Sequence, residues 1–243
     1  RDVRQTCVLL LERVALTIDA ARLPVAAANT FGACEAIMSD VVEGRFEVSR
    51  LRALSIEDLL EREAIQVDGA ELGRYLKGKV VLITGAGGSI GSEIARQVNR
   101  FLPSRLILLG RGENSIYEIG LELPEAETIV CNVCRMEPLL KIMRECKPNV
   151  VFHAAAHKHV PLMEPRASEA VHNNVFGTLN VMEACQEVGV ERFVVLSTDK
   201  AVNPSSVMGV TKRLAELLVA KRGTRGYAAV RFGNVLGSRG SVV

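Results

Sequence analysis

A hydroxyl, a carboxylate and an ammonium group stand side by side at Thr198-Asp199-Lys200, directly after an apolar run. Neighbouring Asp and Lys residues can act as acid and base when burial and nearby charges shift their pKa values. On an exposed surface the same two residues form only a solvated ion pair. The apolar run favours the first interpretation, because it predicts a central strand, and doubly wound sheets carry their chemistry at the carboxyl ends of such strands.

A glycine-rich turn at residues 84–91 follows four apolar residues and precedes a predicted helix. Gly85 permits a tight turn, Gly88 lets a pyrophosphate approach the backbone, and Gly91 lets helix and strand pack closely. The N–H groups at the start of the helix suit phosphate. The spacing is Gly-x-x-Gly-x-x-Gly, and its strand and helix context favours a dinucleotide over a plain turn. The predicted cofactor contacts here are Thr84, Gly85, Gly88, Ser89, Ile90 and Gly91.

The residues after the second predicted strand bear on the choice between NAD and NADP. An acidic side chain there binds the ribose hydroxyls of NAD, whereas this chain has Gly110 followed by Arg111. A guanidinium suits a 2′-phosphate, which favours NADP. NAD stays open, because Arg111 can be a solvated surface residue while Glu113 binds the ribose.

Strand and helix candidates alternate from Lys79 onward, which predicts an α/β fold with a doubly wound parallel sheet over residues 77–243. Residues 1–76 are expected to be a connector or the tail of a preceding domain. The predicted strands are Val80–Thr84, Arg105–Leu109, Thr128–Asn132, Val150–Ala154, Phe193–Ser197 and Ala228–Phe232. The predicted helices are Ser89–Phe101, Asn114–Leu123, Glu137–Cys146, Ser168–Val188 and Val207–Lys221.

Composition excludes several classes of function. The net charge of +2 gives no argument for a nucleic-acid partner, and no run of about 18 apolar residues predicts a membrane span. The six cysteines are scattered through apolar stretches and are expected to be reduced. Cys131 and Cys134 have metal-ligand spacing without a second pair, and His157 and His159 have no acidic residue fixed nearby. No metal site is therefore predicted.

Small residues at Ala154 and Ala155, after the fourth predicted strand, would let the backbone lie against the dinucleotide. Asn173 and Asn174 lie early in a long apolar helix. A buried amide needs hydrogen-bond partners, so we expect one of them to bind a neighbouring strand or loop. A polar face of the helix is the alternative.

These motifs, with Lys212 and the residue four before it, resemble the extended short-chain dehydrogenase/reductase superfamily, whose members bind NAD(P) on a Rossmann fold. Within it the chain resembles the CapD-type polysaccharide-biosynthesis proteins, the bacterial nucleotide-sugar 4,6-dehydratases. The resemblance covers about residues 41–243. The residues that carry it are Glu113-Asn114-Ser115, His153–Glu164, Ser197–Pro204, Met208–Lys212 and Arg231–Ser241.

The resemblance implies a reaction on UDP-N-acetylglucosamine or a close relative. Hydride leaves carbon 4 of the sugar, water is eliminated across carbons 5 and 6, and the hydride returns to carbon 6. By position, Asp199 would protonate the leaving hydroxyl and Lys200 would be the base at carbon 5. Thr198 would hold the carbon 4 oxygen, and Lys212 would bind the nicotinamide ribose and supply positive charge.

Two residues depart from the superfamily pattern. Met208 stands where a Tyr normally takes the carbon 4 proton, and a thioether cannot do so. Thr198 with Asp199, or a bound water, would replace it; Met208 itself can also be a plain packing residue. Asn132 stands where relatives carry an Asp near the adenine. A 4-epimerase and a non-catalytic NAD(P)-binding module are the competing functions.

Relatives continue into a smaller domain that closes over the sugar nucleotide, so the resemblance implies a fragment with its cofactor fold intact, a truncated substrate domain and an incomplete sugar site. His157 and Asn234 are the predicted substrate contacts. The implied partners are a UDP-amino-sugar and further copies of the chain, without nucleic acid. Long members begin with membrane helices, which implies the cytoplasmic side of the bacterial inner membrane for the full-length protein.

Overall fold

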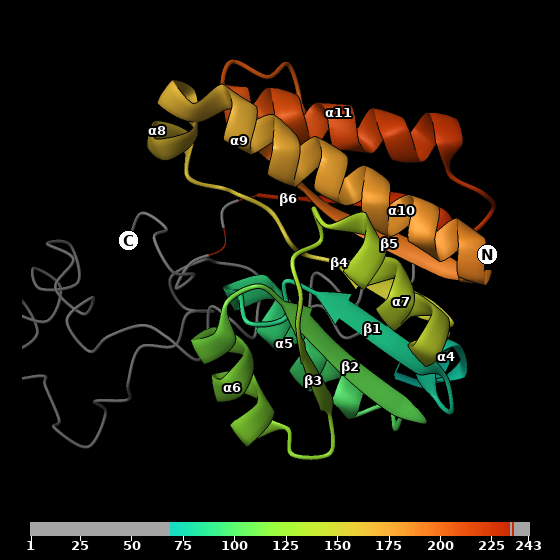
Figure 1. Ribbon diagram of the computed structural model, residues 1–243. Helices are drawn as coiled ribbons and strands as arrows, with labels where there is room; N and C mark the ends of the chain where they lie inside the picture. Colours follow the sequence, from blue (N-terminus) through green and yellow to red (C-terminus); the bar gives the residue numbers. More distant parts are fainter. Residues whose placement is uncertain (1–68, 234, 236–243) are drawn as a thin grey trace, which may run out of the picture.

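The computed structural model describes residues 69–233 and 235, which form a six-stranded parallel sheet with helices on both faces (Figure 1). The strand order is β3-β2-β1-β4-β5-β6, and all five pairings are parallel. The chain steps outward from β1 to β3 and then returns to β4 on the other side of β1. This reversal is the switch point at which doubly wound sheets bind ligands, and it confirms the predicted fold class. The strands are β1 Val80–Thr84, β2 Arg105–Gly110, β3 Glu127–Val130, β4 Val150–His153, β5 Arg192–Thr198 and β6 Tyr227–Phe232.

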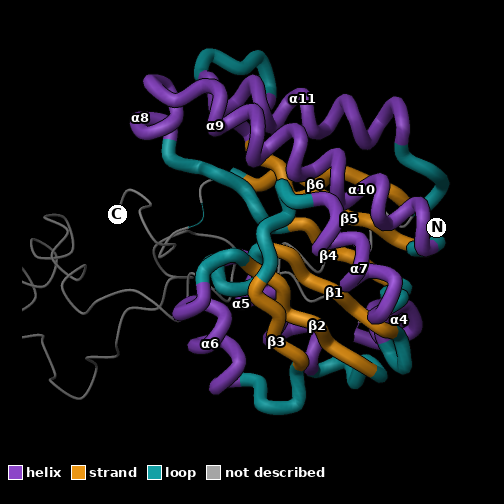
Figure 2. The backbone as a smooth tube through the Cα atoms, viewed as in Figure 1, coloured by secondary structure: helices purple, strands orange, loops and turns teal. Residues whose placement is uncertain are grey.

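Eight α-helices occur among the described residues, and they cover the two faces of the sheet (Figure 2). Successive side chains of a strand point to opposite faces, and β1 shows the consequence. Val81 and Ile83 pack with residues of α5 and α6, whereas Leu82 packs with residues of α7, α10 and α11. The helices are α4 Gly69–Leu76, α5 Ser89–Asn99, α6 Glu113–Glu122, α7 Met136–Cys146, α8 Val160–Met163, α9 Ala167–Val171, α10 Gly177–Val188 and α11 Val207–Arg222.

The helix predicted at residues 168–188 is a composite. A π-helical turn, His172–Phe176, joins α9 to α10, so the helical path continues with one widened turn. Such turns carry an extra residue per hydrogen-bonded ring and are frequent at functional sites. The short helix α8 and the 3₁₀ turn Glu164–Arg166 lie in a stretch for which the sequence pattern predicted no helix.

The third strand ends two residues earlier than predicted. Its pairing with β2 ends where Val130 lies opposite Gly110, and Cys131 then donates one more backbone hydrogen bond to Gly110. Asn132 has left the sheet. Its side chain accepts a hydrogen bond from the backbone N–H of Cys134, which turns the chain toward α7.

The fold includes part of the predicted connector. Leu76 of α4 belongs to the core, and the Arg192 guanidinium lies 4.5 Å from the centre of the Tyr75 ring. The domain boundary at residue 76 remains a prediction, since residues 1–68 lie outside the described part of the chain. Among the described residues, no helix is long and apolar enough to cross a membrane.

Candidate active site

The glycine turn packs against the backbone that follows β4. Gly85 has φ of +67°, and a Cβ there would lie 2.6 Å from the backbone nitrogen of Ala155. A Cβ on Gly91 would lie 2.2 Å from the carbonyl oxygen of Gly85. The turn therefore brings bare backbone next to Ala154-Ala155 at the switch point, and only glycine permits this approach.

The start of α5 is suited to an anion. Gly88 precedes the helix without a side chain that would cap its N–H groups, and the first turn contains no acidic residue. Backbone N–H groups at a helix start and the positive end of the helix dipole suit a phosphate. These features fit the pyrophosphate of a dinucleotide.

A cleft of about 300 Å³ lies at this edge of the sheet. Seven of the predicted binding residues line it: Gly85, Gly88, Arg111, Asn132, Ala154, Ala155 and His157. The other lining residues, which the sequence analysis did not propose as contacts, are Gly87, Gly110, Gly112, Ser115, Cys131, Val133, Ala156 and Asn173. The predicted set thus converges from four separate segments of the chain on one cleft.

The remaining predicted contacts of the turn do not line the cleft. Thr84 is fully buried, and its Oγ1 lies 2.7 Å from Nδ1 of His153. Ser89, Ile90 and Gly91 form the first turn of α5 and do not line the cleft. The structure places Thr84 where it supports the turn and keeps its hydroxyl bound to His153.

At the carboxyl end of β5, Thr198, Asp199 and Lys200 form a hydrogen-bonded group. Thr198 Oγ1 donates to Asp199 Oδ1 over 2.8 Å, and Lys200 Nζ lies 3.2 Å from the same oxygen. The hydrogen bond from Thr198, aided by Lys200, holds the pKa of the Asp199 carboxyl below its usual range. Asp199 is therefore ionised near neutral pH. The side chains of Lys200 and Asp199 are 43% and 53% exposed, respectively.

Lys212 approaches the same strand end from α11. The residue is buried, and its Nζ donates a hydrogen bond to the carbonyl oxygen of Leu196. Burial lowers the pKa of the Lys212 ammonium to about 8, although the Glu216 carboxylate opposes this fall. Lys212 can therefore supply a positive charge below about pH 8 inside the sheet edge.

Met208 is a packing residue in this structure. It is 3% exposed and belongs to a small apolar cluster with Met163 and Ala170. The cluster joins α8 and α9 to the first turn of α11, and a hydrogen bond from the Val207 N–H to Glu164 supports the same junction. The side chain at this position stabilises the helices and offers no proton acceptor.

A buried polar network lies behind the cleft, between β1, β4 and α10. Burial, with a smaller contribution from the Lys212 charge, lowers the pKa of His153 to about 3. Thr178 Oγ1 donates to the carbonyl of Asn174, so it must accept from His153 Nε2, 3.0 Å away. The neutral ring therefore carries its proton on Nε2 and accepts from Thr84.

Asn174 lies in the π-helical turn and confirms the expectation that one of the two asparagines binds a loop. Its Oδ1 accepts from the His157 N–H, and its Nδ2 donates to the His157 carbonyl and to Thr211. The expectation that no acidic residue lies near the histidines is wrong for His157. Its Nε2 lies 3.3 Å from Glu169, because the helical path folds α9 back beside the loop.

Among the described residues, no group of three or more His, Cys, Asp or Glu side chains is arranged to hold a metal ion. Four described cysteines are free, and burial raises the pKa of Cys131 and Cys134. Asn234, the second predicted substrate contact, lies outside the described residues.

The comparison with protein families matches residues 81–243 to the family described as "Polysaccharide biosynthesis protein". The capsular polysaccharide biosynthesis protein CapD of Staphylococcus aureus is 51% identical over 217 residues, which covers 85% of this chain and 36% of that protein. The chain thus spans about a third of the length of that relative.

Two further relatives are 37% identical to the chain. One is a UDP-N-acetylglucosamine 4,6-dehydratase (inverting) of Campylobacter jejuni, matched over 68% of this chain and 52% of that protein. The other is a UDP-glucose 4-epimerase of Rickettsia rickettsii, matched over 68% and 51%. Among solved structures, UDP-glucose 4-epimerase from Brucella ovis in complex with NAD has a TM-score of 0.57 at 21% identity, over 63% of this chain and 51% of that one. This last likeness concerns the fold alone.

Proposed function

The chain belongs to the polysaccharide biosynthesis protein family, and on that premise we propose that the full-length protein is a nucleotide-sugar 4,6-dehydratase acting on UDP-N-acetylglucosamine or a close relative. The observation that carries the proposal is the Thr198-Asp199-Lys200 group at the carboxyl end of β5. This strand pairs with β4, and the residues that follow β4 line the cleft. Elimination of water needs an acid and a base close together, and this group offers both.

NADP is the proposed cofactor, with NAD as the alternative. The glycine turn and the uncapped start of α5 support a pyrophosphate site, and Arg111 lines the cleft beside Asn132. When bound, the dinucleotide supplies the means to remove a hydride from carbon 4 and return it to carbon 6. Lys212 would hold the nicotinamide ribose and keep a positive charge nearby.

The ionised state of Asp199 supports a route for the first proton transfer. The carbon 4 hydroxyl would lose its proton to Thr198, which passes its own proton along the 2.8 Å hydrogen bond to Asp199. The carboxylate becomes a carboxylic acid as carbon 4 becomes a carbonyl. This relay replaces the Tyr that the superfamily uses, and a bound water in place of Thr198 is the alternative.

The proton stored on Asp199 then serves the elimination. Neutral Lys200 would take the carbon 5 proton, which the new ketone has made acidic, while Asp199 protonates the carbon 6 hydroxyl that leaves as water. After hydride returns to carbon 6, Lys200 gives its proton back to carbon 5. Both side chains end in their starting states.

A 4-epimerase is the second candidate, since a relative with that name is as similar to this chain as the dehydratase is. Both reactions oxidise carbon 4 and need a proton acceptor there, so the buried thioether of Met208 does not separate them. An epimerase has no use for an acid and a base that eliminate water, whereas Asp199 and Lys200 can form such a pair. This pair favours the dehydratase.

The decisive experiment incubates the full-length protein with UDP-N-acetylglucosamine and either NADP or NAD, and identifies the product by NMR. We expect a 4-keto-6-deoxy sugar nucleotide. An epimerised hexose would support the second candidate. Tight cofactor binding with an unchanged sugar nucleotide would support a non-catalytic binding module and contradict both enzymatic functions.

The organisation of the full-length protein is part of this proposal. Residues 77–243 would form the NAD(P)-binding domain, residues 1–76 a connector, and a further segment would close over the sugar nucleotide. We also propose a homo-oligomer working on the cytoplasmic side of a membrane. Size-exclusion chromatography with light scattering and fractionation of cells that express the full-length protein test these two points.

A further inference from the structure

The buried carboxylate of Glu216 joins three elements at the carboxyl edge of the sheet. It lies on α11, one turn beyond Lys212, and the residue is 7% exposed. Its Oε1 accepts from the Ser197 hydroxyl over 2.6 Å and from Arg231 Nε over 2.7 Å. Its Oε2 accepts from a second Arg231 nitrogen over 2.6 Å and from Arg213 over 2.9 Å. Both oxygens are thus fully engaged with donors from β5, β6 and α11.

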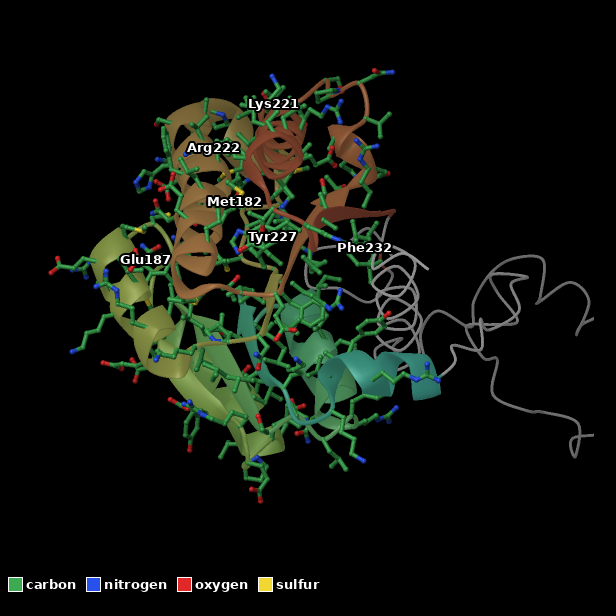
Figure 3. The ribbon with its side chains drawn as sticks, turned by 90° about the vertical axis from the view of Figure 1, so that its right-hand side faces the viewer. Met182, Glu187, Lys221, Arg222, Tyr227 and Phe232 are labelled. Atoms are coloured by element: carbon green, nitrogen blue, oxygen red, sulfur yellow. The ribbon has the colours of Figure 1, made fainter. Side chains whose placement is uncertain are left out.

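The two strands that bind Glu216 lead into the segments of the proposed site. Ser197 directly precedes the Thr198–Lys200 group on β5. Arg231 directly precedes Phe232, which Figure 3 labels at the end of β6, where the chain leaves the sheet. Lys212, one turn earlier on α11, binds the carbonyl of Leu196. Two successive turns of α11 therefore hold the end of β5 at adjacent residues.

Stability alone does not explain this arrangement. Taking a carboxylate out of water is costly, and apolar residues of similar volume often stabilise a fold just as much as a buried ion pair does. A bidentate pair with Arg231 and a short bond from Ser197 instead fix direction as well as distance. These directional contacts fix the positions of the ends of β5 and β6 relative to α11.

We propose that Glu216 is a positioning residue, which fixes the Thr198–Lys200 group at the end of β5 relative to Lys212 and to the end of β6. The proposal rests on the proposed function, because that function places the reacting groups on these segments. Glu216 acts through Ser197, Arg231 and Lys212.

The charge of Glu216 gives the proposal a second consequence. Burial by itself raises the pKa of the Glu216 carboxyl, but hydrogen bonds from Arg231, Ser197 and Arg213 lower it to about 2. The resulting carboxylate supports the positive charge of Lys212. Among the described residues, His153 on β4 also interacts electrostatically with Lys212, and it stays neutral because its pKa is about 3. Loss of the Glu216 charge should therefore make Lys212 lose its proton at a lower pH.

The test uses Glu216→Gln in the full-length protein and measures NADPH affinity by fluorescence across pH 6–9, together with kcat and KM for UDP-N-acetylglucosamine. We expect the alkaline loss of NADPH affinity to move down by about half to one pH unit, because the coupled carboxylate is gone. We expect kcat to fall about tenfold or more, since misplaced reacting groups lose rate steeply, with a small change in KM. Glu183→Gln on α10 is the matched control, because Glu183 is paired with Arg222 at an exposed site.

A second variant keeps the proposal testable if Glu216→Gln does not fold. Arg231→Lys keeps the positive charge but removes the bidentate geometry. It should lower kcat several-fold while the pH dependence of NADPH affinity stays in place. Glu216→Asp, which restores the charge on a shorter side chain, should return the pH dependence toward that of the unmodified protein.

The proposal is overturned if folded Glu216→Gln keeps both its kcat and its pH dependence of NADPH affinity. It is also overturned if Glu183→Gln produces the same changes. A full-length protein that binds NADPH but forms no keto sugar would contradict the proposed function. The pH dependence of NADPH affinity in Glu216→Gln would still show whether the charge of Glu216 affects the protonation of Lys212.

Discussion

The phosphate-binding end of the proposed site consists mainly of backbone, whereas the catalytic end consists of side chains. At the phosphate end, bare backbone packs on backbone, and a Cβ at Gly91 would lie 2.2 Å from a carbonyl oxygen. At the catalytic end, the proposed acid and base are side chains, and those of Asp199 and Lys200 are about half exposed, at 53% and 43%. A Cβ at Gly85 or Gly91 would collide with backbone at the first end, whereas the reacting groups of the second end are partly exposed to solvent.

This difference separates cofactor binding from catalysis. A backbone site is fixed by the fold itself, because the turn, the helix start and β4 hold one another in place. An exposed acid–base pair is surrounded by water, which screens its charges, and the hydrogen bond from Thr198 keeps the Asp199 carboxyl ionised. The phosphate end is therefore ready for its ligand, whereas Asp199 at the catalytic end must take up a proton before it can act as an acid. The first three variants below each affect one end and should leave the other unchanged.

Lys200→Ala should give the largest effect, confined to catalysis. Removing a general base typically lowers the rate by about 10²–10⁴-fold. The exchange of the carbon 5 proton with solvent should disappear, while NADPH affinity and thermal stability stay near those of the unmodified protein, because Lys200 is an exposed residue. Exchange that persists in the variant would show that Lys200 is not the base. NMR in deuterated water measures this exchange.

Gly91→Ala should have the reverse pattern. The new Cβ collides with the backbone at Gly85, and overpacking of this kind costs about 1–3 kcal/mol. We expect NADPH affinity to fall at least about tenfold and the Tm to drop. Gly73→Ala is the control, because its Cβ would meet only Phe101 at 3.9 Å. Unchanged affinity in Gly91→Ala would mean that the turn does not hold the phosphates.

Arg111→Ala should change cofactor preference by a smaller factor. Charge-assisted hydrogen bonds to a phosphate contribute about 1.5–3 kcal/mol, so NADPH affinity should fall roughly tenfold or more while NADH affinity changes little. Arg144→Ala, which removes an exposed ion pair between Arg144 on α7 and Glu187 on α10, is the control. Equal losses for NADPH and NADH would contradict a 2′-phosphate contact. Fluorescence titration with both nucleotides measures the ratio.

Acid should weaken the fold gradually through His153 and Glu216. The folded pKa of His153 is about 3 against an ordinary 6.5, so the unfolded chain takes up this proton first and stability falls as pH drops below about 6.5. Glu216, at about 2 against 4.5, adds a loss below about pH 4.5. The slope for one proton is at most about 1.4 kcal/mol per pH unit. Urea unfolding between pH 4.5 and 7 should show that the free energy of unfolding falls as the pH falls. His153→Gln should make this pH dependence weaker.

Much of the fold follows from local pattern. The run Val80–Thr84 predicts a buried strand because apolar, mostly β-branched residues have few other stable arrangements, and the glycines after it predict the turn. The sequence predicts the length of the helical path over residues 168–188 but not the π-helical turn within it. A π-helical turn has no side-chain period of its own, and it depends on Asn174 finding partners in the loop at His157 and on α11.

The sequence by itself determined the alternation of strands and helices, the glycine turn and the residue types of the reacting group, because each depends on neighbours along the chain. Only the tertiary structure decided that Thr84 faces His153, that Met208 lies in an apolar cluster and that Glu216 holds β5 and β6. These facts depend on pairs far apart in sequence. Burial and hydrogen-bond satisfaction select such pairs only after the sheet has brought the strand ends together.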